Sequence, residues 1–373
     1  MRILILGGGL QGLSCGCSLY KEHEISVVTS NLMCKHSRFF ESVYSDILAN
    51  DESLYKLLEN EHFDVLIPVS DMTVPFASRN KAHIEEKYGV RCAVPDYAQV
   101  HQVEDKHRFM SFCAANGIPH PKTSVLTADN VDFAASFVGF PSLIKPDYSV
   151  GARGITRVNS LSELKEKYPK VNEKYGACTL QELIENKEYY FNVMLYRNKE
   201  GRILGHTILK IVRMYPVSAG SSSCCITVEN ETLLKICKDC LDKLDWIGMA
   251  DFDVLQRPDN GEYKIIEINP RVPASLRAAA VSGVNFPEII VSDALGQKVP
   301  KYVYSPNKVL RYLGIDIMWL LQSSRRFSAK PCWMKFFGTD IYYQDIYRND
   351  PSTWWTWLAE GLSRISSRNN QLR

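Results

Sequence analysis

Three oxygen-bearing side chains lie on two neighbouring predicted strands. Glu267 and Asn269 are two residues apart at the end of the β-branched run 263–268, so both leave the same face of that strand. Asp253 lies in the apolar run 251–255, and the Pro-Asp-Asn-Gly sequence between the runs is typical of a hairpin turn. Such a hairpin places Asp253 beside Glu267 and Asn269. Hard oxygen ligands suit Mg²⁺, and zinc is not expected because Cys and His are absent from the set.

A lysine and a glycine-containing loop form a second set that could bind an anion. Lys145 ends the predicted strand 142–145, and a loop follows it. The loop contains Ser149, Gly151, Arg153 and Gly154. Glycines let backbone amides approach an anion closely, and a lysine can neutralise phosphate charge. Taken alone, this loop and the hairpin are each also compatible with exposed turns that carry ordinary polar residues.

A glycine-rich motif opens the chain. Residues 7–12 fit the pattern GxGxxG between an apolar strand at 2–6 and a helical pattern at 10–22. This pattern can place a pyrophosphate at a helix N-terminus. The acidic residue that would bind the ribose is absent, because the second strand ends at Val28-Thr29-Ser30-Asn31. A tight turn that packs the first helix on the sheet is therefore favoured over a dinucleotide site.

The composition is that of a globular protein. The 373 residues suffice for two or three domains, and the 45% hydrophobic content supports a substantial core. A net charge of +2 gives no general argument for nucleic-acid or membrane binding. The 11 cysteines have no regular spacing, which favours reduced thiols and a cytoplasmic location. No signal peptide or transmembrane segment is expected.

Strands and helices alternate over the first part of the chain. Strands are predicted at 2–6, 25–29, 63–69 and 91–94, and helices at 10–22, 51–61, 74–88 and 97–115. This alternation predicts a parallel sheet covered by helices.

Shorter strands dominate the second part. They are predicted at 123–126, 142–145, 155–158, 178–183, 189–196, 203–211, 251–255 and 263–268, with a helix at 231–244. Those from residue 178 onward are expected to form one largely antiparallel sheet. The fold class is therefore α/β, and α+β overall. From Lys298 onward the pattern is irregular, basic and rich in tryptophan.

An ordered set of motifs runs through these segments. It consists of Lys106, Gly117 to Thr123, Ile144-Lys145-Pro146 with its loop, Gln181 to Ile184 with Glu188, Asp253, and Glu267-Ile268-Asn269-Pro270-Arg271. This set resembles the ATP-grasp superfamily of carboxylate–amine ligases and carboxylases. The closest branch contains D-aspartate ligase and the large subunit of carbamoyl-phosphate synthase. The resemblance extends from Met1 to Lys298, and the sequence that ends in Arg271 is its most specific part.

The resemblance implies four regions. They are a Rossmann-like domain at 1–96, a small lobe with the phosphate-binding loop at 97–178, a large lobe with the adenine and Mg²⁺ sites at 179–300, and a Trp-rich basic extension at 301–373.

The resemblance also assigns roles to individual residues. Lys106 and Lys145 would hold ATP phosphates, under a loop that includes Ser149, Gly151 and Gly154. Gln181, Glu182, Leu183 and Ile184 would surround the adenine, and Glu188 would hold the ribose. Asp253, Glu267 and Asn269 would bind two Mg²⁺ ions, with Glu267 bridging them. Arg271 would act with Lys145 in catalysis and would stabilise an acyl phosphate.

The implied activity is ATP- and Mg²⁺-dependent joining of a small-molecule carboxylate to an amine, with an amino acid on one side. A homodimer is considered as the assembly. A bicarbonate- or carbamate-phosphorylating enzyme like carbamoyl-phosphate synthase is the main alternative, although no glutaminase-like segment is found. An NAD-dependent oxidoreductase built on residues 7–12 and a non-catalytic nucleotide-binding module are further alternatives.

Substrate residues are sought between the nucleotide strands and the metal hairpin. Lys210, Arg213 and Ser221 lie there, and Arg277 follows Arg271. The alternative is a flexible surface loop at 221–223 with solvated basic residues. The Trp-rich extension is expected to pack on the ligase body and cover the acceptor side. Its aromatic and basic residues could instead meet a lipid surface or an anionic glycan, and nucleic-acid binding is not expected.

Overall fold

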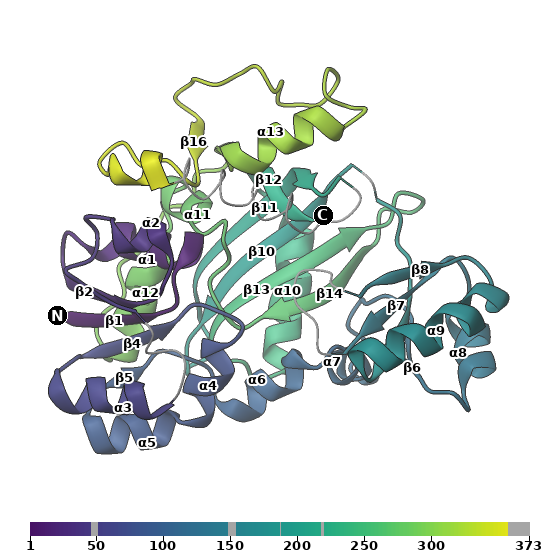
Figure 1. Ribbon diagram of the computed structural model, residues 1–373, viewed down its shortest axis with the longest axis horizontal. Coiled ribbons are helices and arrows are strands. Elements are labelled where there is room, and N and C mark those ends of the chain that lie inside the picture. Colours follow the sequence, from purple (N-terminus) through teal and green to yellow (C-terminus); the bar gives the residue numbers. More distant parts are fainter. Residues whose placement is uncertain (46–50, 148–153, 187, 218–219, 357–373) are drawn as a thin grey trace, which may run out of the picture.

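A computed structural model of the chain describes residues 1–45, 51–147, 154–186, 188–217 and 220–356. Three sheets follow one another through these residues: a parallel sheet, a small sheet and a seven-stranded sheet (Figure 1). The predicted parallel sheet followed by two lobes with antiparallel strands is therefore confirmed. Among the described helices, none has the length and apolar character that a membrane crossing requires.

The N-terminal sheet has the order β3-β2-β1-β4-β5, and all of its strands are parallel. Its strands are β1 (Arg2–Leu6), β2 (Glu24–Val28), β3 (Ser42–Tyr44), β4 (Val65–Pro68) and β5 (Arg91–Cys92). The helices are α1 (Gly9–Leu19), α2 (Leu32–Lys35), α3 (Asp51–Asn60), α4 (Thr73–Arg79) and α5 (Lys81–Tyr88). Alternate residues of β1 enter two cores, because Ile3 packs with α1 and Leu4 packs with α3 to α5.

The first of these cores also joins the N-terminal sheet to the large sheet. It contains Leu13 of α1, Phe286 and Ile289 of α12 (Phe286–Ala294), and Met194 and Leu209 of the large sheet. The N-terminal domain is thus packed on the large lobe through one continuous hydrophobic core, which fixes the carboxyl edge of its sheet against that lobe.

The glycine-rich turn serves helix packing, as the structural interpretation predicts. A Cβ on Gly12 would lie 2.6 Å from the backbone oxygen of Gly7, which cannot move without distorting the turn. We therefore expect Gly12→Ala to lower the free energy of unfolding by about 1–3 kcal/mol, as overpacking does elsewhere. Urea unfolding measures the change, with Gln11→Ala in the same helix as control. Equal stability of the two variants would contradict the packing role.

The helix predicted at 97–115 is divided in the structure. Asp105 has an extended backbone between α6 (Tyr97–Glu104) and α7 (Lys106–Ala115), and its side chain accepts a hydrogen bond from the Arg108 amide at 2.8 Å. When an Asp side chain caps the N-terminus of a following helix, its own backbone is extended and the preceding helix ends there. Lys106 consequently becomes the first residue of α7. The helix predicted at 74–88 divides similarly at Asn80, between α4 and α5.

The small sheet has the order β6-β9-β7-β8 and is antiparallel. It contains β6 (Thr123–Leu126), β7 (Ser142–Pro146), β8 (Thr156–Val158) and β9 (Cys178–Glu182), with helices α8 (Val131–Val138) and α9 (Leu161–Tyr175). We expected β9 in the large sheet, and this was wrong. Cys178 and Leu180 enter the core formed by this sheet with α8 and α9, which explains the pairing.

The large sheet has the order β14-β13-β10-β11-β12-β15-β16. Its strands are β10 (Tyr190–Arg197), β11 (Ile203–Tyr215), β12 (Ser221–Val228), β13 (Gly248–Gln256), β14 (Tyr263–Asn269), β15 (Val309–Arg311) and β16 (Ile341–Tyr343). Its further helices are α10 (Glu231–Lys243), α11 (Arg277–Val281) and α13 (Leu313–Gln322). The segment considered as a flexible loop at 221–223 is the start of β12. Strands β15 and β16 show that the C-terminal extension continues the sheet (Figure 1).

Candidate active site

The predicted metal hairpin is formed by β13 and β14. Asp253 lies directly opposite Glu267, and Asp251 lies opposite Asn269. The structure therefore brings together Asp253, Glu267 and Asn269, as their spacing predicted. On the other side of β13, Asn192 of β10 pairs with Asp253, and its side-chain amide donates to the Asp253 carboxylate at 3.2 Å.

Asp251 and Asn192 adjoin the predicted metal ligands, and the sequence interpretation missed both. Asp251 is buried, and neither its Oδ1 nor the Oδ1 of Asn192 has a hydrogen-bond partner among the described residues. Asp251 could have been found, because it precedes Asp253 by two residues and leaves the same face of β13. Asn192 depends on the pairing of β10 with β13, which no local pattern reveals.

The electrostatics of this cluster favour a cation. Burial, and then the charges of Glu267 and Asp251, raise the pKa of Asp253 well above its usual range. Burial also raises the pKa of Asp251. Buried carboxylates that repel one another are stabilised when a divalent cation binds between them. The unpartnered oxygens and this concentration of acidic groups fit Mg²⁺.

The protein alone does not complete a metal site here. In the described part of the chain, no group of three Cys, His, Asp or Glu side chains is arranged to hold a metal ion. The amide of Asn269 and oxygens from outside the protein would have to contribute. That requirement is typical of Mg²⁺, which binds one or two carboxylates and completes its shell with water and substrate phosphate.

Lys145 is buried at the end of β7 and points at the same region. Its ammonium donates to Gln181 Oε1 at 2.6 Å, and Gln181 Nε2 donates to Thr123 Oγ1 at 3.0 Å. Burial lowers the pKa of Lys145 to about 8; Glu267 and Asp253 oppose this shift, and Lys106 adds to it. Lys145 therefore lies close enough to Lys106, Glu267 and Asp253 for their charges to affect its pKa.

The predicted adenine segment connects the two lobes. Glu182 ends β9 of the small sheet, and the chain then runs through Leu183, Ile184 and Glu188 to β10 of the large sheet. The Glu182 carboxylate pairs with Arg257 and accepts from the Lys122 amide at 3.1 Å. Ile184 is buried and Glu188 is exposed. This linker therefore carries the predicted adenine residues from the small sheet to the large sheet.

The predicted phosphate loop is described only at its end. Gly154 has a φ of +76°, and a Cβ there would lie 2.9 Å from the ring of Pro146, so glycine is required. Ser149, Gly151 and Arg153 lie outside the described residues.

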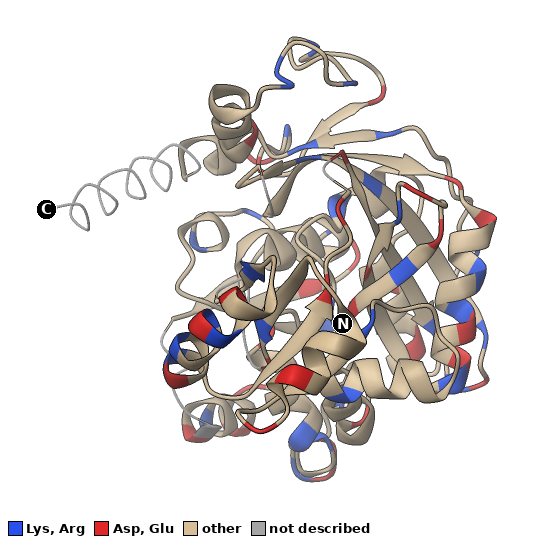
Figure 2. Cartoon of the chain, turned by 90° about the vertical axis from the view of Figure 1, so that its right-hand side faces the viewer, with Lys and Arg blue, Asp and Glu red and all other residues tan. Residues whose placement is uncertain are grey.

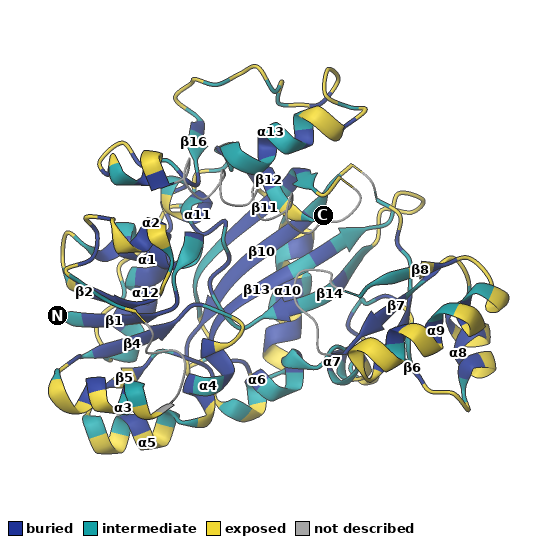
Figure 3. Cartoon of the chain, in the orientation of Figure 1, coloured by how far each residue is buried: buried dark blue, intermediate teal, exposed yellow. Residues whose placement is uncertain are grey.

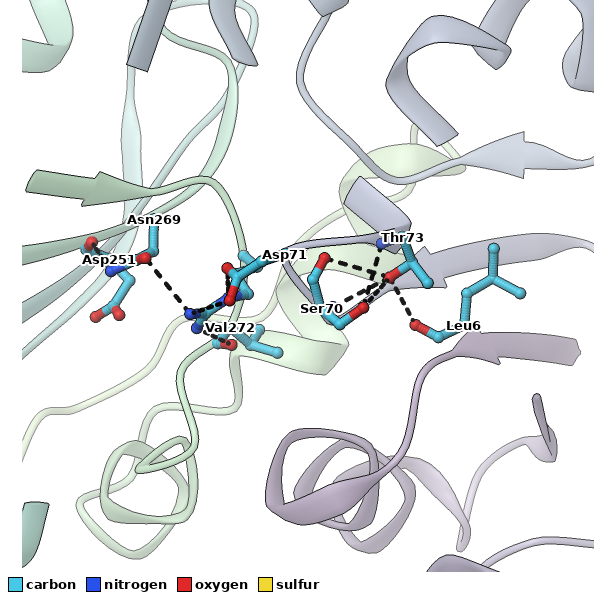
Figure 4. A network of polar contacts seen from close by, with 8 residues as sticks. Leu6, Ser70, Asp71, Thr73, Asp251, Asn269 and Val272 are labelled. Carbon is cyan, nitrogen blue, oxygen red and sulfur yellow. Dashed lines mark hydrogen bonds and ion pairs between the residues drawn. The ribbon is translucent and has the colours of Figure 1, made fainter. Parts of the chain in front are cut away.

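Arg271 joins the hairpin to the N-terminal domain. Its guanidinium donates to both oxygens of Asp71, at 2.5 and 3.2 Å, and to Asn269 Oδ1 at 3.4 Å (Figure 4). Burial lowers the pKa of Arg271, but Asp71, Asp251 and Glu267 outweigh it, so the pKa is raised overall. Arg271 therefore remains charged beside the predicted metal ligands.

Asp71 was also missed from the sequence. It follows β4 at the carboxyl edge of the parallel sheet, which is where such sheets place functional residues. The turn that carries it is braced, because the Thr73 hydroxyl donates to the Leu6 carbonyl at 3.0 Å and accepts from the Ser70 amide at 3.1 Å (Figure 4).

The predicted substrate residues do not share one environment. Lys210 lies over the ring of Tyr189, 3.7 Å from its centroid, and Ser221 is exposed at the start of β12. Arg213 is fully buried and donates to both oxygens of Asp316 in α13, at 2.7 and 3.0 Å. Its assignment to substrate is thus corrected, because it binds the C-terminal segment instead.

Arg277 also contacts the C-terminal segment. It donates to the carbonyls of Tyr343 and Ile346, the latter at 2.6 Å, and lies 3.7 Å from the ring centroid of Tyr347. Tyr347 in turn bonds Ser14 of α1 at 3.0 Å. The extension therefore packs on both the large lobe and the N-terminal domain.

Comparison with known proteins agrees with this arrangement. The family model described as "ATP-grasp in the biosynthetic pathway with Ter operon" matches residues 179–316, which include the hairpin and Arg271. The predicted resemblance to the ATP-grasp superfamily is thus confirmed for these residues. The chain is 23% identical to D-aspartate ligase of Enterococcus faecium over 327 residues, which are 79% of this chain and 76% of that protein. The predicted branch is thereby confirmed.

A second relative is longer. The chain is 25% identical over 244 residues to the C-terminal section of the carbamoyl phosphate synthase large chain of Methanopyrus kandleri, covering 62% of this chain and 43% of that one. The chain thus spans less than half the length of this relative.

Solved structures show that the ATP-grasp fold is shared. The biotin carboxylase domain of Hydrogenobacter thermophilus 2-oxoglutarate carboxylase, crystallised with MgADP and bicarbonate, has a TM-score of 0.70 at 15% identity and covers 83% of this chain and 73% of its own. N5-carboxyaminoimidazole ribonucleotide synthetase of Thermotoga maritima has a TM-score of 0.61 at 18% identity, with coverages of 81% and 78%.

Proposed function

We propose that this protein is an ATP- and Mg²⁺-dependent ligase that joins a carboxylate to an amine through an acyl phosphate. One observation carries the proposal: Lys145 of the small lobe, the Asp253 and Glu267 pair of the large lobe, and Arg271 meet in one site. Cations on one side and carboxylates on the other are what a triphosphate with bound metal requires.

The chemistry follows from these groups. A carboxylate is a poor electrophile until the γ-phosphoryl group of ATP is transferred to one of its oxygens, which gives an acyl phosphate and ADP. Lys106 and Lys145 would bind the phosphates and offset their charge as the anionic carboxylate approaches. Mg²⁺ held by Asp253, Glu267 and Asn269 would supply further neutralising charge. We infer two such ions.

Arg271 would act in the second step. When the amine attacks the acyl carbon, the C–N bond forms and negative charge develops on the carbonyl oxygen. Phosphate then leaves as the carbonyl re-forms, and it can take the proton that the nitrogen loses. A guanidinium can donate two hydrogen bonds to such an oxygen. Arg271 contacts Asn269, so it lies beside the phosphoryl-transfer centre.

The substrates are proposed from the relatives. Similarity to D-aspartate ligase over most of both chains supports an amino acid as one substrate, whereas the carbamoyl phosphate synthase relatives support bicarbonate or carbamate. Screening amino acids and small acids for release of ADP and phosphate tests the proposal. Turnover that needs only bicarbonate would favour the alternative, and tight ATP binding without turnover with any acid would oppose a ligase.

A nicotinamide site on the glycine-rich turn is a weaker candidate. A Cβ on Gly8 would meet Thr29 Oγ1 at 2.2 Å, so the turn is closely packed against the end of β2. Titration with NADH distinguishes the two functions, since a ligase should show saturable binding of ATP and none of NADH.

Asp71 is proposed as a positioning residue for Arg271. We expect Asp71→Asn to lower kcat about tenfold or more, because one charged partner that orients the guanidinium is lost, while the KM for ATP stays nearly unchanged. Steady-state kinetics with saturating acceptor separate the two constants, and Glu86→Gln on the exposed face of α5 is the control. A large rise in the ATP KM with unchanged kcat would contradict this role.

A further inference from the structure

The segment 321–337, which begins in the last turn of α13, exposes an unusual number of large apolar side chains. Phe327 is 91% exposed, Phe337 87%, Met334 71% and Leu321 63%. In Figure 3 the loop that follows α13 lies above the large sheet and is coloured mainly as exposed. Leaving such side chains in water is unfavourable, and exposed apolar groups gathered on one segment indicate a binding surface.

The same segment is basic. Asp316 in α13 is buried. Between Asp316 and Asp340 the sequence contains no acidic residue and four basic residues. Basic residues are blue in Figure 2. The cations are Arg325, Arg326, Lys330 and Lys335. Arg326 and Lys330 are exposed, whereas Lys335 lies 3.4 Å from Asp340. Apolar tips and basic side chains therefore alternate along one acid-free stretch.

The base of the segment is held firmly. Arg213 donates to the Pro331 carbonyl at 2.8 Å and Arg311 donates to the Lys335 carbonyl at 3.0 Å. The indole of Trp333 donates to the Asp316 carbonyl at 3.0 Å. Buried arginines thus fix the backbone on the protein side, and the phenylalanines of the other side stay directed outward.

We propose that the segment 321–337 docks on a membrane surface that contains anionic lipids. Phenylalanine and methionine side chains can enter the interface between headgroups and acyl chains, while lysine and arginine stay at the level of the phosphates. A protein partner would be expected to meet a continuous apolar patch with a mixed polar rim. Here isolated apolar tips stand beside the exposed Arg326 and Lys330 in a stretch whose sequence has no acidic residue, and this pattern complements an anionic lipid surface.

Co-sedimentation of the full chain with vesicles tests the proposal. We expect binding to vesicles of phosphatidylcholine mixed with phosphatidylglycerol, and little to phosphatidylcholine alone. Each basic side chain near such a surface strengthens binding about fivefold, so Arg326→Gln with Lys330→Gln should weaken it about 25-fold. Phe327→Ser with Phe337→Ser should weaken it by at least tenfold, because apolar burial in the interface is lost.

Matched variants elsewhere serve as controls. Phe133 and Phe137 are 69% and 50% exposed on α8, and Lys199 and Arg202 are exposed basic residues in the turn before β11. Serine at the first pair and glutamine at the second should leave vesicle binding unchanged. Absence of binding to anionic vesicles, equal binding to neutral vesicles, or equal loss in the control variants would each overturn the proposal. Self-association that depends on Phe327 and Phe337, without vesicle binding, would assign the segment to an interface between copies.

Discussion

Replacing Glu267 by glutamine is expected to lower acceptor-dependent ADP formation by roughly a hundredfold or more, because metal-based charge neutralisation is worth several kcal/mol in such sites. Glutamine keeps the shape of the side chain but removes the charge that would offset both Mg²⁺ ions. Nucleotide binding should persist, since the contacts proposed for Lys145, Glu182 and Glu188 do not involve Glu267. Single-turnover kinetics and ATP titration measure the two effects separately.

The structure predicts that Glu267→Gln folds well. Glu267 faces Asp253, whose pKa is raised by burial and then by the charge of Glu267, so removing that charge relieves repulsion. Glu262→Gln, at an exposed position in the turn of the same hairpin, is the control. Lys145→Ala should differ by weakening nucleotide binding as well as turnover. Near-normal ligation by Glu267→Gln would refute the metal assignment and with it the proposed mechanism.

The parts of the site that were predicted from the sequence are those that local periodicity determines. A strand alternates its side chains with a period of two, so Glu267 and Asn269 had to share a face, and a short turn brought Asp253 opposite Glu267. The parallel N-terminal sheet followed from the same kind of pattern, because buried strands alternating with helices leave few other solutions.

The residues that were missed are placed by long-range pairing. Asn192 reaches Asp253 only because β10 pairs with β13, and Asp71 reaches Arg271 only because two domains share a core. Neither contact leaves a signal in the neighbouring sequence. The prediction of Arg213 as a substrate residue was wrong for the same reason. Its partner Asp316 lies 103 residues away, in a segment that showed no regular pattern.

Replacing Asp316 by asparagine is expected to lower the free energy of unfolding by about 3–5 kcal/mol, the usual cost of leaving buried charges without a partner. Asp316 is completely buried. It accepts hydrogen bonds from Arg213 at 2.7 and 3.0 Å and from Arg311 at 2.9 Å, and the Ser223 hydroxyl donates to it at 3.3 Å. One carboxylate thus compensates two buried guanidinium groups, which join β11, β15 and α13.

Urea unfolding of the intact chain measures this loss, and limited proteolysis reports whether the segment after α13 detaches first. Asp340→Asn is the matched control, because that partly exposed carboxylate pairs with the exposed Lys335 and should change stability by at most about 1 kcal/mol. Replacing all three charges together, with Arg213→Met, Arg311→Met and Asp316→Leu, should recover most of the stability, since no buried charge then remains unpaired. If Asp316→Asn were no less stable than Asp340→Asn, the C-terminal extension would have to be held by its apolar contacts alone, and the buried ion pairs would have no part in fixing it over the large sheet.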